Sequence, residues 1–93
     1  MRISRAKCRS GRIPDVRALM EELEKRLHEA PRVQHSITVL TANGELIVMG
    51  YFPDKQACQA TAHVNEKRWD QAADMFEEPP VVTEGEVLAF VTL

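Results

Sequence analysis

One Asn-Gly pair between two strand-like runs constrains the fold of this chain most strongly. The runs 33–41 and 45–52 are rich in β-branched and aromatic residues, and they flank the tripeptide 42–44. Asn-Gly between alternating apolar runs predicts a type I′ β-hairpin, because that turn needs a positive φ at both central positions. With Asn43 and Gly44 as the two turn residues, Ala42 pairs with Glu45 and the register of the whole hairpin follows.

A helical pattern precedes the hairpin. It begins near Ile13 with Pro14 in the first turn, where the missing N–H of proline costs nothing. Pro31 is expected to end the helix by disfavouring helical geometry at Ala30. Its apolar residues recur at helical spacing and form one stripe: Val16, Leu19, Met20, Leu23 and Leu27.

A second helical pattern follows the hairpin. It begins at Asp54, a good N-cap residue, and ends before the sequence 77–80, Glu-Glu-Pro-Pro. Its inner stripe is mostly small and apolar and is formed by Ala57, Ala60, Thr61, Val64, Arg68, Ala72 and Met75. A second stripe beside it contains Cys58, Ala62, Asn65, Trp69 and Phe76, so the apolar face is wider than one packing contact needs.

A short strand over 2–8 and a β-rich run over 84–93 complete the pattern. The order β-α-β-β-α-β is that of the ferredoxin-like α+β fold, an antiparallel sheet with two helices on one face, here as a single domain spanning 1–93. Many unrelated functions use this architecture, so the order of elements does not reveal a reaction.

Composition limits the classes of protein to consider. The chain has 93 residues, no apolar run of the roughly 18 residues that a membrane span needs, and no apolar segment behind its basic N-terminus. We therefore expect a cytoplasmic protein. Residues 1–17 hold six basic residues and one acidic residue, which either attract an anion or form a solvated surface.

Two cysteines are too few for a disulfide scaffold, and they lack metal-ligand spacing. Cys8 ends the first strand and Cys58 begins the second helix. We expect the first and third strands to be parallel neighbours, which would place both thiols near the same end of the sheet. They are then either a redox pair or two unrelated reduced thiols. No metal and no cofactor is expected.

The hairpin register divides its residues between two faces. One face would lie under the helices and carry Val33, His35, Ile37, Val39, Leu46, Val48, Gly50 and Phe52. The opposite face contains Leu40, Ile47, Met49 and Tyr51, which are too apolar for open water. Two helices cover only one face of a sheet, so this second face predicts a homodimer related by a two-fold axis.

The chain resembles the dimeric α+β barrel proteins of the antibiotic biosynthesis monooxygenase-like superfamily over nearly its whole length. The residues that carry the resemblance are the turn 9–12 (Arg-Ser-Gly-Arg), the junction 51–57 (Tyr-Phe-Pro-Asp-Lys-Gln-Ala) and the run from 78–80 (Glu-Pro-Pro) to 87–88 (Val-Leu). The resemblance implies two sheets packed face to face in a dimer and a ligand pocket between each sheet and its helices.

Members of this superfamily include cofactor-independent quinone-forming monooxygenases and haem-degrading enzymes, in which Asn, Trp and His or Tyr residues recur. Asn65, Trp69 and His63 are of these types, but all three lie on the second helix. Haem degradation implies an Asn on the first strand, which this chain lacks. His63 lies outside both apolar stripes and is expected to be solvated.

His35 is the candidate catalytic residue, a general base toward a phenolic substrate, placed opposite Phe52 on the helix-facing side. The alternative is a histidine at the end of the sheet with its polar edge in water. Phe52, Asn65 and Trp69 are the candidate ligand-binding residues, although such a stripe also suits helix or interface packing.

Three functions remain open from the sequence. They are a cofactor-independent monooxygenase-like enzyme acting on a small aromatic substrate, a non-catalytic small-ligand-binding module, and a structural dimer subunit. Nucleic-acid binding is not expected, because the strands lack the exposed aromatic residues of an RNA-recognition domain. A metallochaperone would need a Cys-x-x-Cys motif, which is absent from the sequence.

Overall fold

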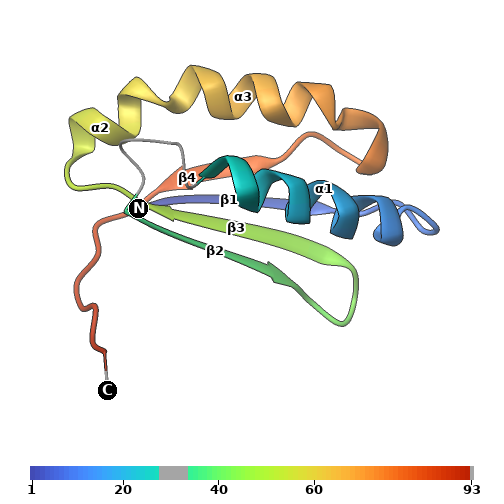
Figure 1. The fold of residues 1–93 in the computed structure, drawn as a ribbon, viewed down its shortest axis with the longest axis horizontal. Coiled ribbons are helices and arrows are strands. Elements are labelled where there is room, and N and C mark those ends of the chain that lie inside the picture. The colour runs from blue at the N-terminus through green and yellow to red at the C-terminus, as the bar shows by residue number, and fades with distance from the viewer. Residues whose placement is uncertain (28–33, 93) are drawn as a thin grey trace.

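The computed structural model describes residues 1–27 and 34–92 and shows a small α+β fold consistent with the ferredoxin-like architecture (Figure 1). The strands are β1 (Arg2–Lys7), β2 (His35–Leu40), β3 (Glu45–Tyr51) and β4 (Val81–Glu84). The helices are α1 (Ile13–Leu27), α2 (Lys55–Ala60), α3 (Ala62–Gln71) and a short 3₁₀ turn, η1 (Ala73–Met75). The predictions for Ala30, Pro31, Val33 and Leu93 concern residues outside the described ranges.

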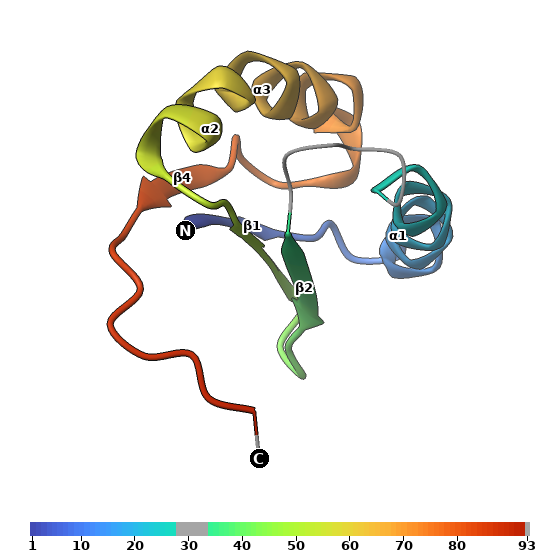
Figure 2. The same cartoon turned by 60° about the vertical axis from the view of Figure 1, so that its left-hand side comes forward.

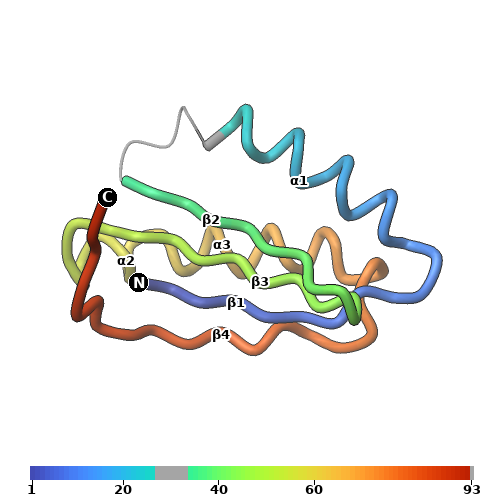
Figure 3. Tube along the Cα trace, turned by 90° about the horizontal axis from the view of Figure 1, so that it is seen from below, coloured from blue at the N-terminus to red at the C-terminus, as the bar shows by residue number. Residues whose placement is uncertain are grey.

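The four strands form one antiparallel sheet in the order β2-β3-β1-β4. The helices lie on one face of it, and Figure 2 shows α1 and α3 on the same side of the strands. Seen from below, the opposite face of the sheet has no helix over it (Figure 3). None of the described helices is long and apolar enough to cross a membrane.

The hairpin has a three-residue loop, not the predicted two-residue loop. The Thr41 backbone N–H donates to the Glu45 carbonyl at 2.9 Å, and the Gly44 N–H donates to the Thr41 carbonyl at 3.0 Å. Gly44 has φ +84°, whereas Asn43 has no positive φ. This is a type I turn closed by a left-handed glycine, so the type I′ prediction is wrong.

The longer loop moves the register by one residue. Leu40 pairs with Leu46 and Val39 pairs with Ile47, whereas the sequence analysis paired Leu40 with Ile47. A one-residue change of register exchanges the two faces of a strand. Ser36, Thr38 and Leu40 therefore lie beneath the helices, while His35, Ile37 and Val39 lie on the open face.

A substitution at Gly44 tests this turn. Gly44→Val is expected to lower the free energy of unfolding by about 1–2 kcal/mol, because a β-branched residue resists a left-handed backbone. An added Cβ would meet only the Lys7 and Ile13 side chains, at 3.5 Å or more, so strain and not collision is the cause. Gly85→Val is the control, since nothing lies within 4 Å of its Cβ position. Equal urea midpoints for the two variants would contradict the assigned turn.

The second helix of the sequence analysis is two helices that meet at Thr61. Asp54 caps α2 as predicted, with its Oδ1 accepting from the Ala57 N–H at 2.7 Å. At the other end of α2, the Cys58 carbonyl accepts from both the backbone N–H and the hydroxyl of Thr61. These bonds, together with one from Arg2, compete with a continuous helical ladder and explain the break.

The first strand is confirmed, but the last strand lies earlier than predicted. β4 follows the proline pair 79–80 with the β-branched run 81–83, and its pairing with β1 ends where Met1 and Gly85 exchange backbone hydrogen bonds. Residues 85–92 leave the sheet, and the predicted strand over 84–93 is therefore wrong. Phe90 nevertheless contacts the open face of the sheet, with its ring centroid 5.0 Å from that of His35 and 6.1 Å from that of Tyr51.

Two buried clusters hold the helices against the sheet. The larger lies at the hairpin end and contains Ala6, Cys8, Val16, Leu46, Ala72 and Phe76, and the smaller contains Phe52, Ala57 and Cys58.

Arg12 connects the start of α1 to η1 through ion pairs with Asp15 and Asp74, which raise the pKa of Arg12. Between the larger and the smaller buried cluster lies a cavity that side chains do not fill.

Candidate functional site

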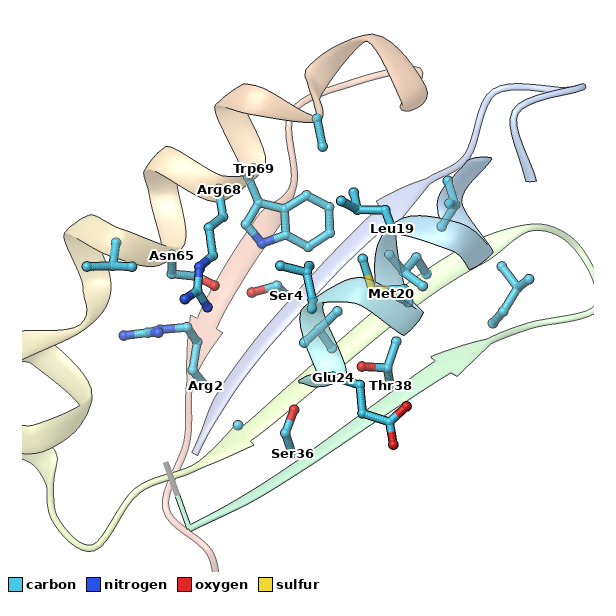
Figure 4. A pocket seen from close by; sticks show the side chains of 18 of the residues that line it. Arg2, Ser4, Leu19, Met20, Glu24, Ser36, Thr38, Asn65, Arg68 and Trp69 are labelled. Carbon is cyan, nitrogen blue, oxygen red and sulfur yellow. The ribbon is translucent and has the colours of Figure 1, made fainter. Parts of the chain in front are cut away.

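A cavity of about 910 Å³ lies between the sheet and the helices α1 and α3 (Figure 4). Its floor is the helix-facing side of β1, β2 and β3, where small residues leave the space open. Ser36 pairs with Gly50, which pairs with Arg2, and the next row holds Thr38, Val48 and Ser4. Larger side chains in these rows would fill the gap beneath the helices.

The lining is mixed in polarity. Its apolar part includes Leu19, Met20, Leu40, Val48, Phe52 and Trp69. Its polar part includes Arg2, Ser4, Ser36, Thr38, Asn65 and Arg68. An apolar concavity with a few convergent polar groups is the usual form of a small-molecule site.

The three residues expected to bind a ligand all line this cavity. Phe52 is buried at the end of β3, and Asn65 and Trp69 face the cavity from successive turns of α3. The Trp69 ring packs on Phe76 with centroids 5.0 Å apart, which holds the indole against the cavity wall. Trp69 therefore also has the packing role that the sequence left open, since one part of its ring contacts the core residue Phe76 and another part borders the cavity.

His35 does not line this cavity. It is exposed and pairs with Tyr51 on the open face of the sheet, so the expectation that it lies beneath the helices is wrong. The cause is the three-residue hairpin loop, which turns His35 to the opposite face. Its contacts are with the rings of Tyr51 and Phe90. His63 is exposed on α3 and lies outside the cavity lining, as expected.

Arg2 is a buried polar residue of the site that the sequence analysis missed. Only 6% of its surface is exposed, and its guanidinium donates to the Cys58 carbonyl and, at 3.0 Å, to the Thr61 hydroxyl. The same group lies 5.1 Å from the centre of the Phe52 ring. An arginine that alternates with Ser4 and Ala6 on the buried side of a strand was the available signal, because charged residues are seldom buried without a role.

Arg68 was also missed as a site residue. It stands in the inner stripe of the second helical pattern, among Ala57, Ala60, Val64 and Ala72. A long cation in an otherwise small and apolar stripe departs from helical amphipathicity. In the structure its side chain lines the cavity, whereas the neighbouring Lys67 does not.

The cysteines do not form a pair. β1 and β3 are antiparallel, so the expectation of parallel neighbours is wrong. Cys8 lies at the hairpin end, and Cys58 lies beside Arg2 at the other, roughly 20 Å away at the rise of a strand. Burial raises the pKa of both thiols. The positive charges of Lys7 near Cys8 and of Arg2 near Cys58 lower these pKa values, but by less than burial raises them. Both are therefore poor nucleophiles at neutral pH.

A metal centre finds no support in the described part of the chain. No three His, Cys, Asp or Glu side chains come together there in a way that could hold an ion. The carboxylates that line the cavity are those of Glu21 and Glu24 on α1, and both residues are exposed. The polar groups of the site are therefore hydroxyl, amide and guanidinium groups, with these two carboxylates at its exposed α1 side.

Comparison with known proteins identifies the fold but no function. No protein-family model matches the chain, and no curated protein is significantly similar to it. A solved structure with the same fold is that of Rv0793 from Mycobacterium tuberculosis, with a TM-score of 0.75. The two sequences are 19% identical over 98% of this chain and 96% of the other. At that identity the likeness concerns the fold alone.

Proposed function

We propose that the protein binds a small, planar, largely apolar molecule in the cavity between its helices and its sheet. The observation that carries this proposal is the convergence of Phe52, Asn65 and Trp69 on one cavity of about 910 Å³. That volume lies within the range of about 300–1,000 Å³ that small-molecule sites occupy. Aromatic walls favour a flat ring, and the Asn65 amide can orient it by hydrogen bonding.

The chain provides its own reporter for this binding. It contains one tryptophan, Trp69, which lines the cavity. In a ¹⁵N-labelled protein the indole N–H gives one assignable NMR signal. Titration with a neutral probe, naphthalene carboxamide, is expected to shift this signal, and calorimetry gives the dissociation constant. An unmoved indole signal with no heat of binding would refute the proposal.

Filling the cavity provides a matched test. Thr38→Phe places a ring on the cavity floor and is expected to weaken carboxamide binding at least about tenfold, because ring and ligand cannot share the space. Thr38→Val keeps nearly the original volume and is the control. Far-UV circular dichroism checks that both variants fold. Equal affinities for the two variants would place the ligand elsewhere.

Cofactor-independent monooxygenase-like chemistry on a small aromatic substrate is the second candidate. The observation in its favour is that Asn65 and Trp69, residue types that recur in the enzymes this chain resembles, face the same cavity. A phenolic substrate also requires a general base, and Glu24 is a candidate within the lining. Oxygen uptake with a dihydroxynaphthalene would support an enzyme, whereas binding without uptake would support a ligand-binding module.

We also propose that two copies associate through the open face of the sheet, as a dimeric α+β barrel. This face carries Ile3, Ile37, Val39, Ile47 and Met49, and half of the Ile37 surface is exposed. Contiguous apolar surface on a sheet usually marks an interface, and a two-fold axis buries the same patch on both copies. Leu40, which the predicted register places on this face, instead lines the cavity on the other side.

A further inference from the structure

Two arginines meet at one end of the cavity. Figure 4 shows the guanidinium groups of Arg2 and Arg68 at the same end, beside the Asn65 amide. Helical geometry explains the approach of Arg68. Asn65 and Arg68 lie one and two turns after Thr61, and side chains on a helix lean toward its N-terminus. Arg68 therefore leans toward Thr61, whose hydroxyl already accepts a hydrogen bond from Arg2.

Neither arginine forms an ion pair within the part of the chain that the structure describes. The ion pairs found there involve Arg5, Arg12 and Arg26. Glu84 is next to Arg2 by register, but its carboxylate accepts from the Cys58 thiol at 3.6 Å. Arg2 is buried and Arg68 is exposed, and an anion bound between the two guanidinium groups would offset the repulsion between their like charges.

We infer that this end of the cavity is an anion subsite, and that the ligand is an aromatic carboxylate. The inference rests on the proposed function and narrows its ligand class. The carboxylate accepts hydrogen bonds from the Arg68 guanidinium and the Asn65 amide and lies in the field of Arg2. The aromatic ring extends along Trp69 toward Leu19 and Met20 on α1. Arginine suits this role because its planar fork matches a carboxylate.

A pair of ligands with the same ring system tests the subsite. Naphthalene carboxylate and naphthalene carboxamide differ in charge and share the naphthalene ring. The carboxylate is expected to bind the native protein about tenfold more tightly, as hydrogen bonds to charged groups allow. Calorimetry measures both affinities, and the Trp69 indole signal confirms that each ligand enters the cavity.

Variants of α3 then assign the effect to one residue. Arg68→Gln is expected to remove the preference for the carboxylate and to leave carboxamide binding within about twofold, since only the charged contact is lost. Lys67→Gln removes the same charge from the adjacent position outside the cavity and is expected to change neither affinity. Arg68→Lys keeps the positive charge but lacks the planar guanidinium that can donate two parallel hydrogen bonds. This variant is expected to retain part of the preference for the carboxylate over the carboxamide.

The outcomes separate this inference from the proposed function. Equal binding of the two ligands to the native protein would overturn the anion subsite and leave the binding proposal intact. Equal loss of carboxylate affinity in Arg68→Gln and Lys67→Gln would also overturn the anion subsite. General electrostatic attraction to positive charge on α3 would then explain the preference for the carboxylate. Failure of both ligands to bind would overturn the proposed function and the inference together.

Discussion

Met49→Lys is expected to convert a dimer of this protein into monomers. Met49 lies at the centre of the open sheet face, paired with Ile37 on one side and Ile3 on the other. In a dimer about a two-fold axis, the substitution would bury two unpaired ammonium groups, each at a cost of several kcal/mol. Light scattering should report a mass near 10.5 kDa, against about twice that for the native protein.

The substitution is designed to separate association from folding. Met49 is partly exposed within one chain, so a lysine there can extend its charge into water once the partner has left. Ala18→Lys is the control, because it adds the same charge at an exposed position of α1, on the helix side of the sheet. A native protein that is already monomeric, or a Met49→Lys dimer, would contradict the proposed interface.

Local signals in the sequence predicted the elements well where one residue type determines the geometry. Asp54 caps a helix because its carboxylate can accept a backbone N–H, and Gly44 adopts a left-handed backbone that other residues resist. These effects depend on a few neighbouring atoms. They can therefore be inferred without knowing what the rest of the chain does.

Which residues of β2 face the helices could not be predicted from such local signals. The two faces of β2 depend on whether the hairpin loop has two or three residues, and the sequence Ala-Asn-Gly at 42–44 suits both. Both faces of β2 and β3 are also partly apolar, so the hydrophobic pattern does not choose between the registers. The predicted two-residue loop wrongly placed His35 in the site, whereas the observed register places Ser36 and Thr38 there.

The arginines of the site show a second limit. Asn65 and Trp69 were identified because aromatic and amide residues at helical spacing suggest a pocket wall, and Phe52 because the predicted register placed it opposite His35. Arg2 and Arg68 lie far apart in the sequence, on β1 and α3, and only the packing of α3 over β1 brings them to one cavity. The sequence shows a basic N-terminal segment, but it does not show that Arg2 of this segment lies near Arg68.

Leu46→Ala is expected to lower the free energy of unfolding by about 3 kcal/mol, within the 2–5 kcal/mol typical of buried leucines. Leu46 is 1% exposed and pairs with Ala6 and Leu40 in the sheet, beneath Val16 of α1. Truncation removes apolar contacts that hold α1 over the sheet and enlarges the ligand cavity, which Leu46 borders.

Urea denaturation of the native protein and its variants at one protein concentration measures this effect, since the stability of a dimer depends on concentration. Val64→Ala is the control. Val64 is 47% exposed on α3, and its truncation is expected to change stability by no more than about 0.5 kcal/mol. A loss at Leu46 no larger than that at Val64 would show that the hairpin end is not the core, and that α1 is held over the cavity by other contacts.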